Sequence, residues 1–188
     1  MFSLKIIIAS TRPGRKGPAI GAWIYETAKN NPVFEVTLLD LAIINLPFLD
    51  EPHHPRLKKY EQEHTKNWST IIDDSDAFIF VTPEYNFGYP APLKNALDFL
   101  YHEWSYKPVA FVSYGGLAGG TRSVQMLKQV VTALKMMPIV ESVNLPFFTK
   151  HLNEQDTFVP DDSITKSAEA MLSELTKWAE SLKTMRMK

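Results

Sequence analysis

Cysteine is absent from the 188-residue chain. Its absence excludes disulfide bonds, thiolate metal sites and thiol nucleophiles. A large charge of either sign is also missing, because 20 basic and 21 acidic residues leave a formal net charge of −1. Such a balance gives no general attraction to nucleic acid or to an anionic membrane, so any anion-binding site has to be local.

Long apolar runs are missing as well. No stretch approaches the roughly 18 apolar residues of a membrane helix, and the N-terminus lacks the apolar region and cleavage site of a signal peptide. We therefore expect a cytoplasmic protein with neither a nucleic-acid nor a membrane partner. The chain does contain 45% hydrophobic and 12% aromatic residues, as folded globular proteins do. No linker or repeat interrupts it, which predicts one domain over residues 1–188.

Apolar runs alternate with helical patterns along the chain. The predicted strands are 4–9, 34–39, 77–82, 109–114 and 138–143, and the predicted helices are 18–28, 57–71, 92–101, 124–134 and 164–182. Residues 42–56 are rich in proline and predict a loop, and Asp161 or Asp162 can cap the last helix. The alternation predicts an α/β three-layer sandwich, with a five-stranded parallel sheet in the order 2-1-3-4-5.

The first strand ends in the loop STRPGRKG, residues 10–17, and Pro18 then opens a helix. The N-terminus of a helix offers unpaired N–H groups and a partial positive charge, and Arg12 can fork onto phosphate oxygens. The spacing fits neither a dinucleotide fingerprint nor a P-loop, and no cysteine nucleophile is present. The loop therefore predicts a site that binds a phosphate without cleaving it; the alternative is a basic surface loop.

The third strand is followed by TPEYNFGYP, residues 82–90. A strand-end loop that exposes Tyr85, Phe87 and Tyr89 together indicates a planar ligand or a partner surface. Asn86 and the N–H groups near Gly88 could bond the polar edge of a ring. The alternative is that these aromatic side chains pack under the loop as a small satellite core.

The fourth strand is followed by SYGGLAGGTRS, residues 113–123, with four glycines in six residues. Such a backbone passes close to something flat or adopts positive φ, although a mobile turn is the alternative. The carboxyl ends of parallel strands meet at one edge of a sheet, where ligands bind in this architecture. A phosphate at one loop and a flat ring against two others fit a flavin mononucleotide.

The segment PEYNFGYPAPLKNALDFL, together with the S-T-R loop and the SYGGLAGGTR loop, resembles the NADPH-dependent FMN reductases of the flavodoxin-like fold. That family includes NAD(P)H:quinone and azo-dye reductases, and the resemblance covers roughly residues 3–140. It implies an FMN cofactor, NADPH or NADH as co-substrate, and a homodimer or homotetramer. The implied reaction is ping-pong hydride transfer from NADPH through FMN to a quinone, an azo dye or a similar acceptor.

The resemblance also implies site residues. Those expected at the FMN phosphate are Ser10, Arg12, Lys16, Gly17 and Pro18. Those expected around the ring and ribityl chain are Pro83, Glu84, Tyr85, Asn86, Phe87, Ser113, Tyr114, Gly115 and Gly116. Gly119 and Arg122 would contact the nicotinamide nucleotide, with a dimer neighbour as the alternative for Arg122. Because the flavin carries the chemistry, no catalytic side chain and no metal are expected.

The alternative function is an FMN-binding electron carrier, or a redox-responsive regulatory protein, without efficient NADPH turnover. Elsewhere in the chain, His53 and His54 predict a solvated loop and not a metal site. Four further side chains are expected to be exposed, at the acceptor pocket or at a dimer contact: Phe48, Leu49, Trp104 and Tyr106.

Overall fold

The structure is a computed structural model that describes residues 1–186. Its strands are β1 (Phe2–Ile8), β2 (Phe34–Asp40), β3 (Ala77–Pro83), β4 (Pro108–Gly115) and β5 (Met137–Pro146). Its α-helices are α1 (Gly17–Lys29), α2 (Leu41–Ile44), α3 (Glu63–Asp73), α4 (Ala91–Asp98), α5 (Thr121–Ala133) and α6 (Asp162–Arg186). Three short 3-10 helices complete the described chain: η1 (Pro55–Leu57), η2 (His102–Trp104) and η3 (Phe148–His151).

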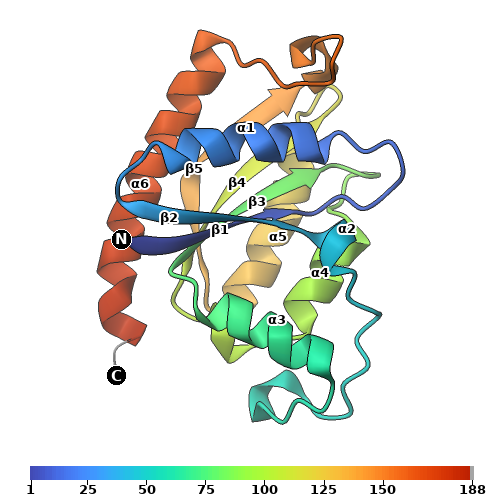
Figure 1. The fold of residues 1–188 in the computed structure, drawn as a ribbon, viewed down its shortest axis with the longest axis vertical. Helices are drawn as coiled ribbons and strands as arrows, with labels where there is room; N and C mark the ends of the chain where they lie inside the picture. The colour runs from blue at the N-terminus through green and yellow to red at the C-terminus, as the bar shows by residue number, and fades with distance from the viewer. Residues whose placement is uncertain (187–188) are drawn as a thin grey trace.

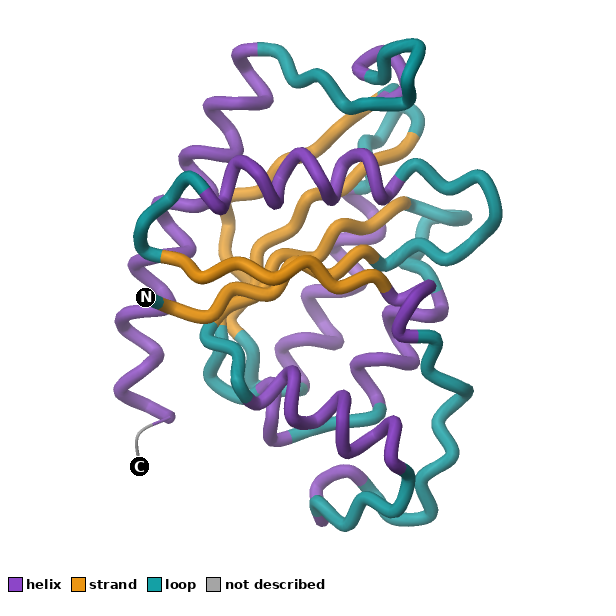
Figure 2. Tube along the Cα trace, viewed as in Figure 1, coloured by secondary structure: helices purple, strands orange, loops and turns teal. Residues whose placement is uncertain are grey.

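The five strands form one parallel sheet in the order β2-β1-β3-β4-β5, as the sequence predicts (Figures 1 and 2). Central strand β3 is buried along its whole length. A parallel strand that is covered on both faces reads as a continuous apolar run, which is why AFIFV was recognisable as a strand.

Helices α1 and α6 cover one face of the sheet, and α3, α4 and α5 cover the other (Figure 1). The first layer is largely aliphatic. The second contains a group of aromatic rings, in which Trp104 lies 5.1 Å from Phe78 and 6.4 Å from Phe80 between ring centroids. No helix within residues 1–186 is long and apolar enough to span a membrane.

Several predicted element boundaries are wrong, and each for a local reason. The predicted loop 42–56 begins with helix α2, because Asp40 caps it by accepting a bond from the Ala42 N–H. The helix predicted from residue 57 starts only at Glu63, since Lys58 adopts a positive φ of 50°. The helix predicted over 92–101 runs from Ala91 to Asp98. The expected cap of the last helix is confirmed: Asp161 accepts the N–H of Ile164 at 2.9 Å.

The expectation that Trp104 is exposed is wrong. Its side chain is fully buried, and its indole N–H donates to the carbonyl of Leu97. Tyr106 is partly buried and lies just before β4, at the amino edge of the sheet, away from the strand-end loops. Phe48, by contrast, is 88% exposed and Leu49 is 42% exposed, as expected.

Candidate functional site

A pocket of about 310 Å³ lies at the carboxyl edge of the sheet. It is lined by Arg12, Arg15, Lys16, Pro83, Glu84, Tyr85, Tyr114, Gly115, Gly116, Phe147, Phe148 and Thr149. The structure thus brings together the loops that follow β1, β3 and β4, as the order of the strands requires. The other predicted residues lie outside this lining: Ser10, Gly17, Pro18, Asn86, Phe87, Ser113, Gly119 and Arg122.

A fourth segment, residues 147–149 at the start of η3, also reaches the pocket and was missed from the sequence. Strand β5 was expected to end at residue 143, but it continues to Pro146 and carries the next residues to the carboxyl edge. The Phe147 N–H donates to the Gly116 carbonyl at 3.1 Å, and the Phe148 ring lies 5.0 Å from that of Tyr114. Two consecutive phenylalanines, three residues after the predicted strand, were the signal that could have found it.

The three cations of the first loop have different partners. Arg15 forms a two-point ion pair with Asp40 at 2.7 and 2.8 Å and also donates to the Ser10 carbonyl. Lys16 pairs with Asp156 at 2.7 Å. Arg12 is exposed and bonds only the carbonyl of its neighbour Pro13, and within residues 1–186 no carboxylate lies within 4 Å of it. Arg12 is therefore the loop cation most available to an anion.

Ser10 and Tyr114 are buried beneath this loop. The Tyr114 hydroxyl donates to Ser10 Oγ at 3.1 Å, and burial raises the pKa of Tyr114 to about 12, so the phenol remains a donor at neutral pH. Gly17 packs against both: a Cβ at that position would lie 2.4 Å from Ser10 Oγ. The structure thus gives the Ser10 hydroxyl a partner inside the protein and shows why the start of α1 carries glycine.

The glycine-rich turn after β4 forms another wall of the pocket. Gly120 adopts a φ of 83°, and a Cβ there would lie 2.8 Å from the backbone N of Tyr114. Ser113 is buried beneath the turn, where its hydroxyl donates to the Gly119 carbonyl at 2.8 Å. At Gly116 a Cβ would meet nothing within 4 Å, so this part of the wall is open to a ligand.

The loop after β3 forms a tight two-residue turn. The main-chain groups of Tyr85 and Gly88 bond each other at 2.9 and 3.0 Å, with Asn86 and Phe87 at the tip. The Glu84 carboxylate accepts bonds from both the side chain and the backbone N–H of Arg122. The guanidinium of Arg122 also stacks on the Phe87 ring at 3.9 Å. Arg122 therefore contacts this turn, and the nucleotide contact expected for it stays a prediction.

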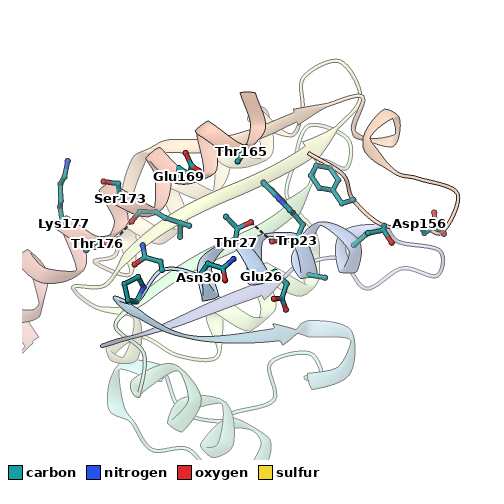
Figure 3. A pocket seen from close by; sticks show the side chains of 17 residues that line it. Trp23, Glu26, Thr27, Asn30, Asp156, Thr165, Glu169, Ser173, Thr176 and Lys177 are labelled. Carbon is teal, nitrogen blue, oxygen red and sulfur yellow. Dashed lines mark hydrogen bonds between the residues drawn. The ribbon is translucent and has the colours of Figure 1, made fainter. Parts of the chain in front are cut away.

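A larger cavity, of about 1090 Å³, lies elsewhere, between α1 and α6 (Figure 3). Trp23 and Thr27 of α1 face Glu169 and Thr176 of α6 across it (Figure 3). It is an open groove at a helix layer, and none of the predicted site residues line it. We place the candidate site at the smaller pocket, because there an unpaired cation, a helix N-terminus and an open glycine turn meet.

The pocket has the features that a phosphate-bearing planar ligand needs. Arg12 and the first turn of α1 offer charge and N–H donors to a phosphate. Tyr85 and the face of Gly116 offer flat contact surfaces to a ring. Its volume of about 310 Å³ lies at the lower end of ordinary ligand sites. The residues present therefore fit FMN.

Comparison with known proteins identifies the family. Residues 3–150 match the family model described as NADPH-dependent FMN reductase. The chain belongs to this family. A relative from Schizosaccharomyces pombe, an NAD(P)H-dependent FMN reductase, is 44% identical over 166 residues, which are 79% of this chain and 82% of that protein. An NADPH:quinone oxidoreductase from Arabidopsis thaliana is 42% identical over 81 residues, which are 42% of this chain and 39% of that protein.

Solved structures agree on the fold. FerB, a flavoenzyme NAD(P)H:(acceptor) oxidoreductase from Paracoccus denitrificans, has a TM-score of 0.75. The match covers 96% of this chain and 98% of that one at 21% sequence identity. The family match makes the protein a flavin-dependent oxidoreductase that uses FMN and a nicotinamide nucleotide, as the sequence predicts.

Proposed function

We propose that this FMN reductase binds FMN in the pocket at the carboxyl edge and reduces quinones, azo dyes or similar planar acceptors. The observation that carries the proposal is the Arg12 guanidinium, which has no carboxylate partner among residues 1–186 and lies at a pocket that also has an open glycine wall. A cation without a carboxylate partner, next to a helix N-terminus, is the arrangement that binds a phosphate.

When bound, FMN would supply the hydride chemistry, the two-electron transfer from a nicotinamide to an acceptor. The protein holds and orients the reactants. Arg12 and the first turn of α1 would hold the phosphate, while Tyr85 and Gly116 would contact the ring. Peptide N–H groups of the Gly115–Gly116 turn would stabilise negative charge on the ring. No side chain has to act as nucleophile or general base, because hydride transfer needs close stacking only.

The remaining assigned residues shape the site from behind the pocket wall. Ser10, Gly17 and Pro18 set the start of α1, and Ser113 supports the glycine turn through Gly119. Part of the charge of Lys16 is already balanced by Asp156, with which it pairs at 2.7 Å. We therefore assign most of the phosphate affinity to Arg12 and less of it to Lys16.

We also propose that the protein works as a homodimer or homotetramer in the cytoplasm. Three exposed apolar side chains lie close together in sequence after β2: Ile43, Phe48 and Leu49. Exposed apolar side chains in one segment are typical of a protein interface. Light scattering of the purified protein should give two or four times the chain mass of 21.4 kDa; a monomer would contradict this assignment.

A spectrum of the purified protein tests the proposed function. It should be yellow, or become yellow on addition of FMN, and anaerobic NADPH or NADH should bleach it. Quinone should then restore the colour. A colourless protein that takes up no FMN would refute the proposal. A yellow protein that NADPH and NADH bleach only slowly would instead favour the electron carrier.

A further inference from the structure

The Glu84 carboxylate and the Arg122 side chain form a compact contact beside the pocket. Glu84 lies directly after β3, and its side chain is only 7% exposed. Its Oε1 accepts the Arg122 Nε–H at 2.5 Å, and its Oε2 accepts the Arg122 backbone N–H at 3.3 Å. The carboxylate therefore also lies at the N-terminus of α5, where the partial positive charge of the helix favours a negative group.

The turn that follows Glu84 is strained. Asn86 and Phe87 have φ values of 50° and 70°, which is the pattern of a type I′ turn. Asparagine tolerates this left-handed conformation, but phenylalanine rarely adopts it, and glycine is the residue usually found at the second position. A strained residue of this kind persists only where its surroundings hold it in place.

Arg122 also supplies a contact that holds the tip of the turn. Its guanidinium lies 3.9 Å from the centre of the Phe87 ring, although Phe87 as a whole residue is 64% exposed. A guanidinium can bond a carboxylate at its edge and stack on a ring with its face. One side chain from α5 thus contacts both the base of the turn, at Glu84, and its tip, at Phe87.

We propose that Arg122 is a positioning residue, which holds the strained turn of residues 85–88 in place through Glu84 and Phe87. Glu84 and Tyr85 form one wall of the pocket, so the turn determines where that wall stands. The consequence for FMN rests on the proposed function, but the effect of Arg122 on the turn does not. This role differs from the nucleotide contact expected from the sequence.

Amide hydrogen exchange in the protein without FMN tests the proposal directly. The probes are the N–H groups of Tyr85 and Gly88, which bond across the turn. Arg122→Gln should raise their exchange rates about tenfold, since the strain of one left-handed residue is no longer opposed. The matched control is Arg56→Gln, because Arg56 stacks on Tyr101 at 4.5 Å and should leave these two amides unchanged.

A second substitution tests whether the backbone strain at Phe87, and not a general loss of order in the turn, causes the faster exchange. Phe87→Gly creates the favoured Asn-Gly turn, which needs no support. Added to Arg122→Gln, it should return the exchange of Tyr85 and Gly88 to the wild-type rate. FMN titration should show affinity lowered about tenfold in Arg122→Gln.

Two results would overturn the proposal. One is unchanged exchange in Arg122→Gln, which would mean that the turn keeps its conformation without Arg122. The other is raised exchange that Phe87→Gly does not correct, which would assign the effect to the unpaired Glu84 carboxylate alone. If the wild-type protein binds no FMN, the proposed function fails, whereas the exchange measurements still decide the role of Arg122.

Discussion

At the amino edge of the sheet, Arg186 and Lys107 border a polar cavity of about 770 Å³; at the carboxyl edge, Arg12 borders a pocket of about 310 Å³. Arg186 bonds Asp76 at 2.5 Å and the Tyr106 carbonyl at 2.9 Å. Lys107 donates to two carbonyls at the end of α3. Arg12 bonds only the carbonyl of the residue next to it.

The difference in hydrogen-bond partners distinguishes a cation that stabilises the fold from one that is available to a ligand. At the amino edge the cations donate to acceptors that would otherwise lack a hydrogen bond. These hydrogen bonds therefore already contribute to the free energy of unfolding. At the carboxyl edge, under the proposed function, the remaining donors of Arg12 bind a ligand. Substitutions at the amino edge should therefore change stability, and substitutions of Arg12 should change binding.

The largest expected effect is at the amino edge, in Glu103→Gln. The Glu103 carboxylate is fully buried and accepts bonds from Tyr60, Ser69 and the Tyr101 N–H. An amide keeps only one acceptor oxygen, so its N–H₂ group would face at least one of these donors, and the variant should lose about 3 kcal/mol of unfolding free energy. Urea unfolding measures the loss, with exposed Glu180→Gln as the control. FMN affinity of the folded variant should not change; a large drop would remove the distinction between the edges.

The next effect is at the carboxyl edge, in Arg12→Gln. Loss of a charge-assisted bond to phosphate costs about 2 kcal/mol, which should weaken FMN binding about thirtyfold. The unfolding midpoint without FMN should stay at the wild-type value, because within residues 1–186 the Arg12 guanidinium bonds only the exposed carbonyl of its neighbour Pro13. Fluorescence titration of FMN provides the measurement, and Lys59→Gln is the matched surface control. Wild-type affinity in Arg12→Gln would show that another group binds the phosphate.

A smaller effect is expected from Tyr114→Phe, which tests the support beneath the phosphate loop. The variant removes the hydroxyl that donates to Ser10 Oγ at 3.1 Å. One buried hydrogen bond is worth about 1 kcal/mol, so the unfolding free energy should fall by that amount. The result can be read from the same urea experiment. An unchanged midpoint would mean that Ser10 does not depend on this bond.

The smallest effect is a pH dependence over a narrow acidic range. Burial alone would raise the pKa of Glu103, but bonds from Ser69 and Tyr60 and the charge of Lys58 outweigh it, and the pKa is lowered from 4.5. The folded state therefore binds this proton less readily than the unfolded state, so Glu103 stabilises the fold above pH 4.5 and less so below it. The stability gap between wild type and Glu103→Gln should narrow as the pH falls below 4.5. A constant gap would contradict the assigned shift.

The sequence was sufficient for the sheet and for the prediction that three strand-end loops meet at one edge of it. Buried parallel strands read as apolar runs, and their order places the loops after β1, β3 and β4 together. The motif after β3 also indicated the family, which the comparisons confirm. These inferences needed only local pattern and one rule of topology.

The partners of individual charges could not be predicted, because they lie far apart along the chain. Asp40 is 25 residues from Arg15, and Asp156 is 140 residues from Lys16. Which of the three loop cations is left for a ligand therefore depends on the folded structure. The loop after β5 was missed for a related reason, since the pairing of β5 with β4 extends to Pro146, beyond the apolar run.

A crystal structure of the protein grown with FMN is the most direct test of where the ligand binds. The phosphate is predicted within hydrogen-bond distance of the Arg12 guanidinium and the first turn of α1, with the ring between Tyr85 and Gly116. FMN seated in the groove between α1 and α6, or a carboxyl-edge pocket that stays empty at saturating FMN, would contradict this placement.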